Sequence, residues 1–365
     1  MIRLQRRLEV PRWADAAVPF ASLLAALGAG SVLLVLTGND PIDTYVRIIE
    51  RGFTSQGALT GTVRSATPLL FTALAATAAF RMGVFNIVGE GQLFMGAIAA
   101  SGVAFWWGEP LGPTVVVVMI AAGLLAGAFW GAIPGVLRAR FNTSEIITSL
   151  MLNYVARNIA TYLIFDAFSS WRTLEGPGRV FPTGRSIPTD AEWQYSHIGP
   201  IDFPFGFWLG VVACAFVWVL YRRTRSGFEV DIIGDSPSAA SYAGMRTRRK
   251  IVSVMGLSGA LAGLAGASNV GDFTHALDPK GLQQAGYGYA GIVIAALARL
   301  NPLAVVPVAL LMGGLSNAGL ALQGPDFPAG LVGTLQGLIL FFVLGGEVLV
   351  RYSVRFSSRT QAVSA

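Results

Sequence analysis

Ten stretches of the chain consist almost entirely of apolar residues, and each is read as one membrane-spanning helix. A helix needs about 20 mostly apolar residues to cross the hydrocarbon layer of a bilayer. The pattern therefore predicts an all-α integral membrane protein with about ten transmembrane helices. The predicted ranges are 18–37, 65–80, 91–107, 113–137, 145–165, 206–221, 251–270, 285–299, 302–320 and 329–349. The second, third and eighth ranges are short, and the third and eighth contain glycine, which suits backbone that is buried in protein or faces a water-filled path.

Positive charge is distributed unequally between the two sides that these spans define. Most of the 26 lysines and arginines fall on the side of the amino terminus, although the loops on the other side are longer. Cytoplasmic segments of membrane proteins carry the excess of Lys and Arg, so both termini are predicted to be cytoplasmic. The predicted organisation is a basic cytoplasmic N-terminus (1–17), a single transmembrane domain (18–350) and a cytoplasmic tail (351–365). Within the domain, 166–205 is an outer loop and 222–250 a cytoplasmic loop.

The composition agrees with a membrane protein and limits its partners. Hydrophobic residues make up 53% of the chain and charged residues 13%, with a mean hydropathy of +0.59, whereas soluble domains carry about 25% charged residues. The net charge of +6 is explained by the basic cytoplasmic segments. We therefore expect the positive residues to lie beside a lipid bilayer, and we expect no nucleic acid partner.

Several kinds of catalytic site are missing from the sequence. A P-loop needs a lysine followed by Ser or Thr, and neither Lys250 nor Lys280 is followed by one. The only histidines are His197 and His275, and the only cysteine is Cys214, too few for the common metal sites or catalytic triads. The sequence thus predicts a protein without its own ATP site, enzyme activity, metal or cofactor.

Carboxylates are also scarce at membrane depth. Glu145 opens one predicted span, Glu347 closes another and Glu90 lies in a break between two. Carriers driven by protons or sodium usually keep carboxylates inside their spans. A self-contained secondary carrier or facilitator is therefore disfavoured, but it stays the alternative to a transporter powered by partner subunits.

The glycine-rich segment 81–96 joins two short apolar runs. Its glycines weaken continuous helix, and Asn86, Glu90 and Gln92 supply polar groups that are costly in lipid unless they find partners. Broken helices of this kind build polar sites inside transporters. One interpretation is a substrate pathway or its gate, and the other is an ordinary cytoplasmic turn.

The fifth predicted span is unusually polar for a membrane helix. It carries Thr148, Asn153, Tyr154, Arg157 and Asn158. These residues either line the pathway or form hydrogen bonds between helices, and Arg157 is expected to face the interior, an aqueous path or the membrane surface. Thr148, Asn153 and Tyr154 are the pathway candidates of this span.

Glycines at every fourth position predict close helix packing. Residues one helical turn apart share a face, and small residues there let a second helix approach closely. The pattern occurs in the fourth span and again in the seventh, at Gly123, Gly127, Gly131, Gly135, Gly259 and Gly263.

The cytoplasmic loop contains a short predicted helix between Gly234 and Gly244. Ser236 suits its N-cap, Pro237 its first position and Gly244 its end. Small and aromatic residues give it an apolar face outside the bilayer, made of Ala239, Ala240, Tyr242 and Ala243. Such a face requires a protein partner, unless the helix lies against the membrane or the neighbouring spans.

Four segments give the chain a recognisable family resemblance. They are 83–93, 147–154, 234–244 and 286–297 followed by Asn301-Pro302, and together they cover about residues 60 to 350. At these residues the sequence resembles the permease subunits of ATP-binding-cassette importers of the ribose and branched-chain amino acid type, most closely those for nucleoside uptake. The resemblance implies a bacterial cytoplasmic (inner) membrane protein that imports nucleosides, or else simple sugars.

The same resemblance implies partners and a second set of functional residues. Two ATP-binding-cassette ATPases bind on the inside, a second permease, related or identical, completes the pore, and an extracytoplasmic binding protein delivers the substrate. In that family the cytoplasmic loop transmits the motion of the ATPases. Here this role maps to Asp235, Pro237, Ala239, Ala240, Tyr242 and Gly244.

Overall fold

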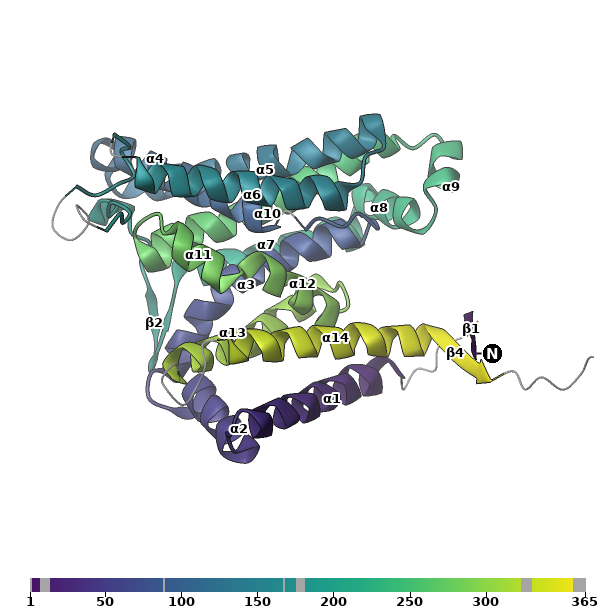
Figure 1. Cartoon of the computed structure of the whole chain (residues 1–365). Helices are drawn as coiled ribbons and strands as arrows, with labels where there is room; N and C mark the ends of the chain where they lie inside the picture. Colours follow the sequence, from purple (N-terminus) through teal and green to yellow (C-terminus); the bar gives the residue numbers. More distant parts are fainter. Residues whose placement is uncertain are drawn as a thin grey trace, which may run out of the picture. The chain divides into compact units, whose positions relative to one another are not determined.

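The computed structural model describes residues 2–6, 14–87, 89–166, 168–174, 181–322 and 330–356. Helices make up most of this part of the chain (Figure 1). The chain divides into two compact units, one formed by residues 1–47 and 322–365 and the other by residues 48–321. The predicted boundaries 1–17, 18–350 and 351–365 stay a prediction, and much of the two predicted terminal segments lies outside the described residues.

The smaller unit is built on two long helices from opposite ends of the chain. Helix α1 (Ala14–Leu36) lies beside α14 (Leu331–Arg351), as Figure 1 shows in purple and yellow. Close packing is possible because Gly30 leaves room for Leu335, and Gly346 leaves room for Ser22. Strand β1 (Ile2–Arg6) pairs antiparallel with β4 (Tyr352–Phe356), and α2 (Pro41–Ile49) follows α1.

The larger unit contains the remaining helices. In chain order they are a π-helix (Glu50–Thr54), α3 (Ala58–Phe80), α4 (Gly89–Leu111), α5 (Val115–Phe141), α6 (Glu145–Phe165), α7 (Phe205–Arg223), α8 (Arg225–Asp235), α9 (Pro237–Tyr242), α10 (Thr247–Ser268), a second π-helix (Asn269–Thr274), α11 (Pro279–Ala285), α12 (Tyr287–Leu297) and α13 (Pro302–Leu322). Short 3-10 turns lie at Gly112–Thr114 and Thr189–Ala191. A small hairpin of β2 (Ser196–Ile198) and β3 (Ile201–Phe203) precedes α7.

Helices α4, α5 and α10 form the centre of this unit through glycine contacts. A side chain at Gly127 would collide with the carbonyl oxygen of Gly259, and one at Gly263 with that of Gly123. A side chain at Gly96 would collide with the backbone of Gly263 as well. The predicted packing role of these glycines is confirmed, and the face of α5 meets the face of α10 that carries the matching glycines.

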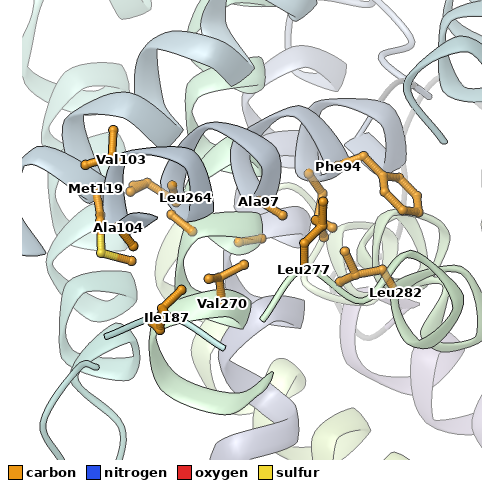
Figure 2. Packing of buried hydrophobic residues seen from close by; sticks show 14 of the residues in the cluster. Phe94, Ala97, Val103, Ala104, Met119, Ile187, Leu264, Val270, Leu277 and Leu282 are labelled. Carbon is orange, nitrogen blue, oxygen red and sulfur yellow. The ribbon is translucent and has the colours of Figure 1, made fainter. Parts of the chain in front are cut away.

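Apolar side chains fill the space around these contacts. Figure 2 shows part of the cluster, to which Phe94 and Ala97 of α4, Leu264 of α10, Met119 of α5 and Val270 of the second π-helix all belong. Residues after α6 also belong to it, namely Ile187, Leu277 and Leu282. The predicted outer loop (166–205) is therefore anchored to the helical core through Ile187, a buried apolar contact.

Every predicted span coincides with a helix. In the described part of the chain, five helical stretches are long and apolar enough to cross a membrane, or six if a bent pair near the amino terminus counts as one span. One of the five, Gly89–Phe141, holds both α4 and α5. These two helices run antiparallel, because Gln92 near the start of α4 lies beside Gly131 near the end of α5. The structure thus supports an all-α membrane protein, while the number of crossings stays a prediction.

Two expectations about the spans were wrong. The second span is not short, since α3 begins at Ala58 and contains 23 residues, and α4 also contains 23. The seventh span continues beyond residue 270 as a π-helix that carries the fully buried Asp272. The predicted range ended at residue 270 because the apolar pattern ends there, so it did not include this buried carboxylate.

Candidate functional site

The link between α3 and α4 is held by a buried pair of side-chain amides. Asn86 donates from Nδ2 to Oε1 of Gln92 at 3.1 Å, and Gln92 donates from Nε2 to Oδ1 of Asn86 at 3.3 Å. Asn86 also donates to Oγ of Ser258 on α10 at 2.6 Å, and Ser258 donates to the carbonyl of Ala75 on α3 at 2.7 Å. The polar groups that the sequence placed in this segment are therefore satisfied by each other and by neighbouring helices, as burial in a membrane protein requires.

Asn153 of α6 fixes both sides of the same link. Its Oδ1 accepts a hydrogen bond from the backbone N–H of Gly91 at 2.8 Å, and its Nδ2 donates to the carbonyl of Ile87 at 2.9 Å. The N–H of Gly91 lies in the first turn of α4 and lacks a partner within the helix, and the carbonyl of Ile87 lies just before the helix begins. The link therefore does not act as a solvated turn, because one buried side chain from another helix closes it.

Glu90 connects the link to the short helix α12. Its carboxylate accepts a hydrogen bond from the backbone N–H of Gly288 at 2.7 Å, and the side chain is only 6% exposed. A Cβ at residue 288 would collide with the backbone nitrogen of Glu90, so glycine is required there. Asn86, Glu90, Gln92 and Asn153 thus meet in one buried network between α3, α4, α6, α10 and α12.

Thr148 and Tyr154 lie apart from this network. Thr148 donates to backbone carbonyls of its own helix, those of Ser144 and Glu145. Tyr154 is 54% exposed, and the guanidinium of Arg157 lies over its ring at 5.0 Å. Of the six pathway candidates, the structure brings four together and leaves these two on the outer side of α6.

The predicted cytoplasmic loop forms two short helices, α8 and α9. Ser236 caps α9 by accepting from the N–H of Ala239 at 3.3 Å, Pro237 takes the first helical position, and Gly244 has a positive φ of 77° after the helix ends. These predicted helix signals are confirmed. Only Ala240 of the predicted apolar face is buried, whereas Tyr242 is 98% exposed, and Asp235, Ala239 and Ala243 are exposed as well.

Two sets of ion pairs hold α8 against the membrane helices. Arg81 after α3 makes a two-pronged contact with Asp231, with Nε–Oδ1 at 2.6 Å and Nη2–Oδ2 at 2.9 Å. Its guanidinium also lies over the ring of Tyr221 at 5.2 Å. The hydrogen bond to Asp231 raises the pKa of Arg81, so the guanidinium stays charged at every physiological pH. Two residues earlier in α8, Glu229 pairs with Lys250 of α10 at 2.7 Å.

Arg81 joins the cytoplasmic loop directly to the α3–α4 link. It begins the segment that leads to Asn86, and a side chain at Gly234 would lie 2.7 Å from the carbonyl of Arg81. Helix α8 therefore touches the link by backbone as well as by charge. Its C-terminal end leads through Ser236 into α9.

A large cavity opens on the side of the predicted outer loop. It measures about 1190 Å³ and lies between the starts of α3 and α5 and the segment before α7. Aromatic and charged groups line it together, among them Arg64, Asp190, Glu192, Trp193, Tyr195, His197, Asp202 and His275. His197 contacts Asp202 through Nδ1 at 2.6 Å. The cavity is wide enough for a small polar solute and is rich in hydrogen-bonding groups.

Asp272 and Arg81 are the residues that the sequence analysis missed. The carboxylate of Asp272 accepts from the N–H of Gly206 at 3.1 Å and from Oγ of Ser268 at 2.6 Å, so it caps the start of α7. An arginine directly after an apolar run, as at Arg81, looked like an ordinary flanking charge. Asp272 had a weak sequence signal, a lone carboxylate just beyond an apolar run. Among the described residues, no group of three or more His, Cys, Asp or Glu is placed to hold a metal.

Comparison with known proteins places the chain in a family. The model of the permease component of the branched-chain amino acid transport system matches residues 58–344. The glucose ABC transporter permease protein TsgB13 of Haloferax volcanii is 34% identical over 97% of this chain and 93% of its own length. The guanosine ABC transporter permease protein NupP of Bacillus subtilis is 32% identical, covering 95% and 97%. No solved structure matches significantly.

A third relative is also described as an ABC transporter permease. The nucleoside ABC transporter permease protein NupB of Lactococcus lactis is 26% identical over 89% of this chain and 90% of its own length. Such permeases are multi-pass membrane subunits that work with separate ATPase and substrate-binding subunits. The chain therefore belongs to the permease family of the branched-chain amino acid transport system, and it is the membrane-spanning subunit of an ATP-binding-cassette importer.

Proposed function

We propose that this permease imports nucleosides, with simple sugars as the second choice, across a bacterial cytoplasmic membrane. The names of the similar permeases, which include guanosine, nucleoside and glucose transporters, support this substrate class. The outer cavity supports it as well, because its carboxylates and ring nitrogens suit the hydroxyl groups of a ribose or hexose. A solute that carries its own hydrogen-bonding groups needs such partners wherever it leaves water.

The proposed assembly contains two ATPase subunits, a second permease and an extracytoplasmic binding protein. The exposed side of α6 supports a permease partner. Tyr154, Asn158 and Tyr162 are spaced by one turn along this side and are all exposed. Lipid cannot satisfy such groups, so they suit a protein surface or an aqueous path. Thr148 and Tyr154 would then face the pathway between two permeases, while Asn86, Glu90, Gln92 and Asn153 would act inside each subunit.

The proposed membrane arrangement has ten crossings with both termini in the cytoplasm. It is supported by the coincidence of each apolar range with a helix and by the excess of positive charge beside α8 and α9. The single transmembrane domain over 18–350 belongs to the same proposal. In this arrangement the large cavity opens to the outside and α9 points into the cytoplasm.

The exposed tip of α9 carries the proposed mechanism. Tyr242 projects from a capped helix that is fixed to the membrane helices through α8. When ATP closes the ATPase subunits, their movement would displace α9, and α8 would pass this displacement to the α3–α4 link. The ATPases can shift the equilibrium between inward-open and outward-open states only by contacting the two states differently. Asp235, Pro237, Ala239, Ala240, Tyr242 and Gly244 are the proposed contact residues.

Purification from the native membrane in mild detergent tests this assembly. We expect a P-loop ATPase, a second permease and an ATP-dependent uptake of labelled nucleoside after reconstitution with the binding protein. A chain that came out alone and imported the solute from an ion gradient without ATP would instead be the self-contained carrier. Uptake of labelled glucose but not nucleoside would keep the assembly and reverse the order of substrates.

Replacing Tyr242 by aspartate should abolish uptake without unfolding the permease. The side chain is 98% exposed, so its removal costs the isolated subunit no packing, whereas a charge would disrupt an apolar contact with the ATPase. Uptake in vesicles and the level of inserted protein are the measurements. Tyr242→Phe keeps the ring and should transport normally, and normal uptake by Tyr242→Asp would refute the docking role.

Replacing Glu90 by alanine should change both transport and the basal ATP hydrolysis of the assembled complex. The buried N–H of Gly288 would lose its acceptor, which costs about 1–3 kcal/mol and frees α12 from the α3–α4 link. Glu109→Ala is the matched control, since Glu109 is exposed at the other end of α4. If Glu90→Ala behaved like this control in both assays, the network would have no part in the pathway or its gate.

A further inference from the structure

A basic pocket lies between α8, the end of α9 and the start of α10. It measures about 500 Å³, which falls within the roughly 300–1,000 Å³ that is typical of small-molecule sites. All but one of its lining residues fall in the predicted cytoplasmic loop 222–250, and the exception is the exposed Ser253. In the proposed membrane arrangement the pocket therefore opens to the cytoplasm.

Five charged side chains line this pocket, and four of them are positive. They are Arg225, Glu229, Arg246, Arg249 and Lys250. The carboxylate of Glu229 pairs with Arg225 at 3.2 Å and with Lys250 at 2.7 Å. The single carboxylate is therefore already bound by two cations, and the lining keeps an excess of three positive charges.

Arg246 and Arg249 provide the part of this charge that a ligand can use. Both side chains are exposed, and no carboxylate in the described part of the chain forms an ion pair with either of them. A guanidinium group donates two parallel hydrogen bonds, which fit the oxygens of a phosphate. A phosphate ester with one free end carries a charge of about −1.5 to −2 at neutral pH, so two such groups match it.

The ring of Phe228 forms an apolar wall of the same pocket. Its side chain is 61% exposed, while Ile233 behind it is buried and Met245 is half-buried. Nucleic-acid bases stack on exposed aromatic rings, because every base has a flat π-face. A ligand that fills both parts of the pocket therefore carries a phosphate and a flat ring.

We propose that this pocket binds a nucleoside monophosphate from the cytoplasm, with its phosphate between Arg246 and Arg249 and its base on the ring of Phe228. Ala243 and Gly244, which follow α9, line the same pocket. The bound nucleotide thus joins α8 and α10 to the end of α9, and it should slow import by restricting the displacement of α9. The effect on import rests on the proposed function, whereas the binding does not.

Binding of labelled guanosine monophosphate to the whole transporter in phosphatidylcholine nanodiscs tests the site. We expect one binding site per copy of this permease. In the double variant Arg246→Gln and Arg249→Gln the affinity should fall about a hundredfold, since each hydrogen bond to a charged group contributes about a factor of ten. In vesicles that enclose ATP, added guanosine monophosphate should slow import by the wild type about fivefold and should not slow import by this variant.

A matched double variant removes the same charge outside the pocket. Arg223 and Arg248 are exposed and do not line it, so Arg223→Gln with Arg248→Gln should bind the nucleotide as the wild type does. Both double variants change exposed side chains, and equal unfolding temperatures would verify that each is folded. Equal affinities of the two double variants would refute the proposal.

A third variant tests the contact with the base. Phe228→Ala should weaken the binding of guanosine monophosphate about tenfold, the effect of losing one stacked base, and should leave the weaker binding of inorganic phosphate unchanged. Unchanged affinity for guanosine monophosphate in this variant would make the pocket a site for a simple anion and overturn the nucleotide assignment. Full displacement of the nucleotide by an equal concentration of inorganic phosphate would overturn it as well.

Two further measurements test other occupants of the pocket. Nucleotide binding should be unchanged in nanodiscs that contain phosphatidylglycerol, and its loss there would assign the pocket to a lipid phosphate. Binding to the isolated permease but not to the whole transporter would show that a partner subunit covers the pocket. Either result would overturn the proposal, as would nucleotide binding that leaves import unchanged. Intact nucleotide binding in a transporter that imports no nucleoside would contradict only the proposed substrate.

Discussion

Replacing Gly263 by alanine should prevent α4, α5 and α10 from closing on one another, and most of the permease should be lost from the membrane. A Cβ at this position would collide with the carbonyl oxygen of Gly123 and would lie 2.9 Å from Cα of Gly127. Both obstacles are backbone, so no side-chain rotation relieves the collision. Overpacking costs about 1–3 kcal/mol and occasionally more, and the upper end applies where only backbone can move, which is a large part of the 5–15 kcal/mol that stabilises an ordinary domain.

The matched control lies on the same helix. Gly256 of α10 meets no atom closer than the carbonyl oxygen of Ala128 at 3.8 Å. Alanine is favoured over glycine in a helix by about 1 kcal/mol, so Gly256→Ala should be neutral or slightly stabilising. The yield of monodisperse protein after detergent extraction and its unfolding temperature measure both variants. Equal values for the two would mean that the close approach at Gly263 does not hold the centre together.

Replacing Asp231 by arginine should separate ATP hydrolysis from import. The change removes the two-pronged partner of Arg81 and sets two positive charges against each other. The side chains of Arg81 and Asp231 are 31% and 41% exposed, so solvent limits the loss of folding free energy to about 1 kcal/mol. The complex should therefore assemble and hydrolyse ATP, while the amount of solute imported per ATP falls about tenfold, which corresponds to about 1.4 kcal/mol of lost coupling.

Exchanging the charges of Arg81 and Asp231 distinguishes a loss of coupling from a loss of folding. The double variant Arg81→Asp and Asp231→Arg should recover a large part of the import per ATP, because an ion pair forms again between α8 and the α3–α4 link. Asp43→Arg reverses the charge of an ion pair that is remote in sequence, the exposed Arg47–Asp43 contact, and should leave import unchanged. If Asp231→Arg imported normally, or if the exchange gave no recovery, the pair would not transmit motion.

Together the contacts define a continuous route from α9 into the membrane. Helix α9 is joined to α8, α8 to Arg81 by Asp231, and Arg81 begins the segment that carries Asn86 and Glu90. From there Glu90 reaches Gly288 of α12. Such a route would give the proposed ATPase-driven displacement a defined set of contacts, each of which can be altered separately.

The sequence by itself determined where helices form. Apolar runs predicted a helix at each of the ten ranges, and the cap signals at Ser236, Pro237 and Gly244 predicted α9. The spacing of Gly123 and Gly127 predicted a close approach on one face of α5. These features depend on neighbouring residues or on helical periodicity, and both can be read directly from the amino-acid sequence.

Only the tertiary structure decided which residues meet. Asp231 lies 150 positions from Arg81, and Gly288 lies 198 positions from Glu90, so no local pattern pairs them. The same holds for Asp272, whose carboxylate finds its N–H partner at Gly206 on another helix. Polar groups buried in a membrane need hydrogen-bond partners, and the sequence shows this need but does not show which residues are the partners. The packing of α3, α4, α6, α10 and α12 selects them, because the protein interior at each site leaves room for one arrangement.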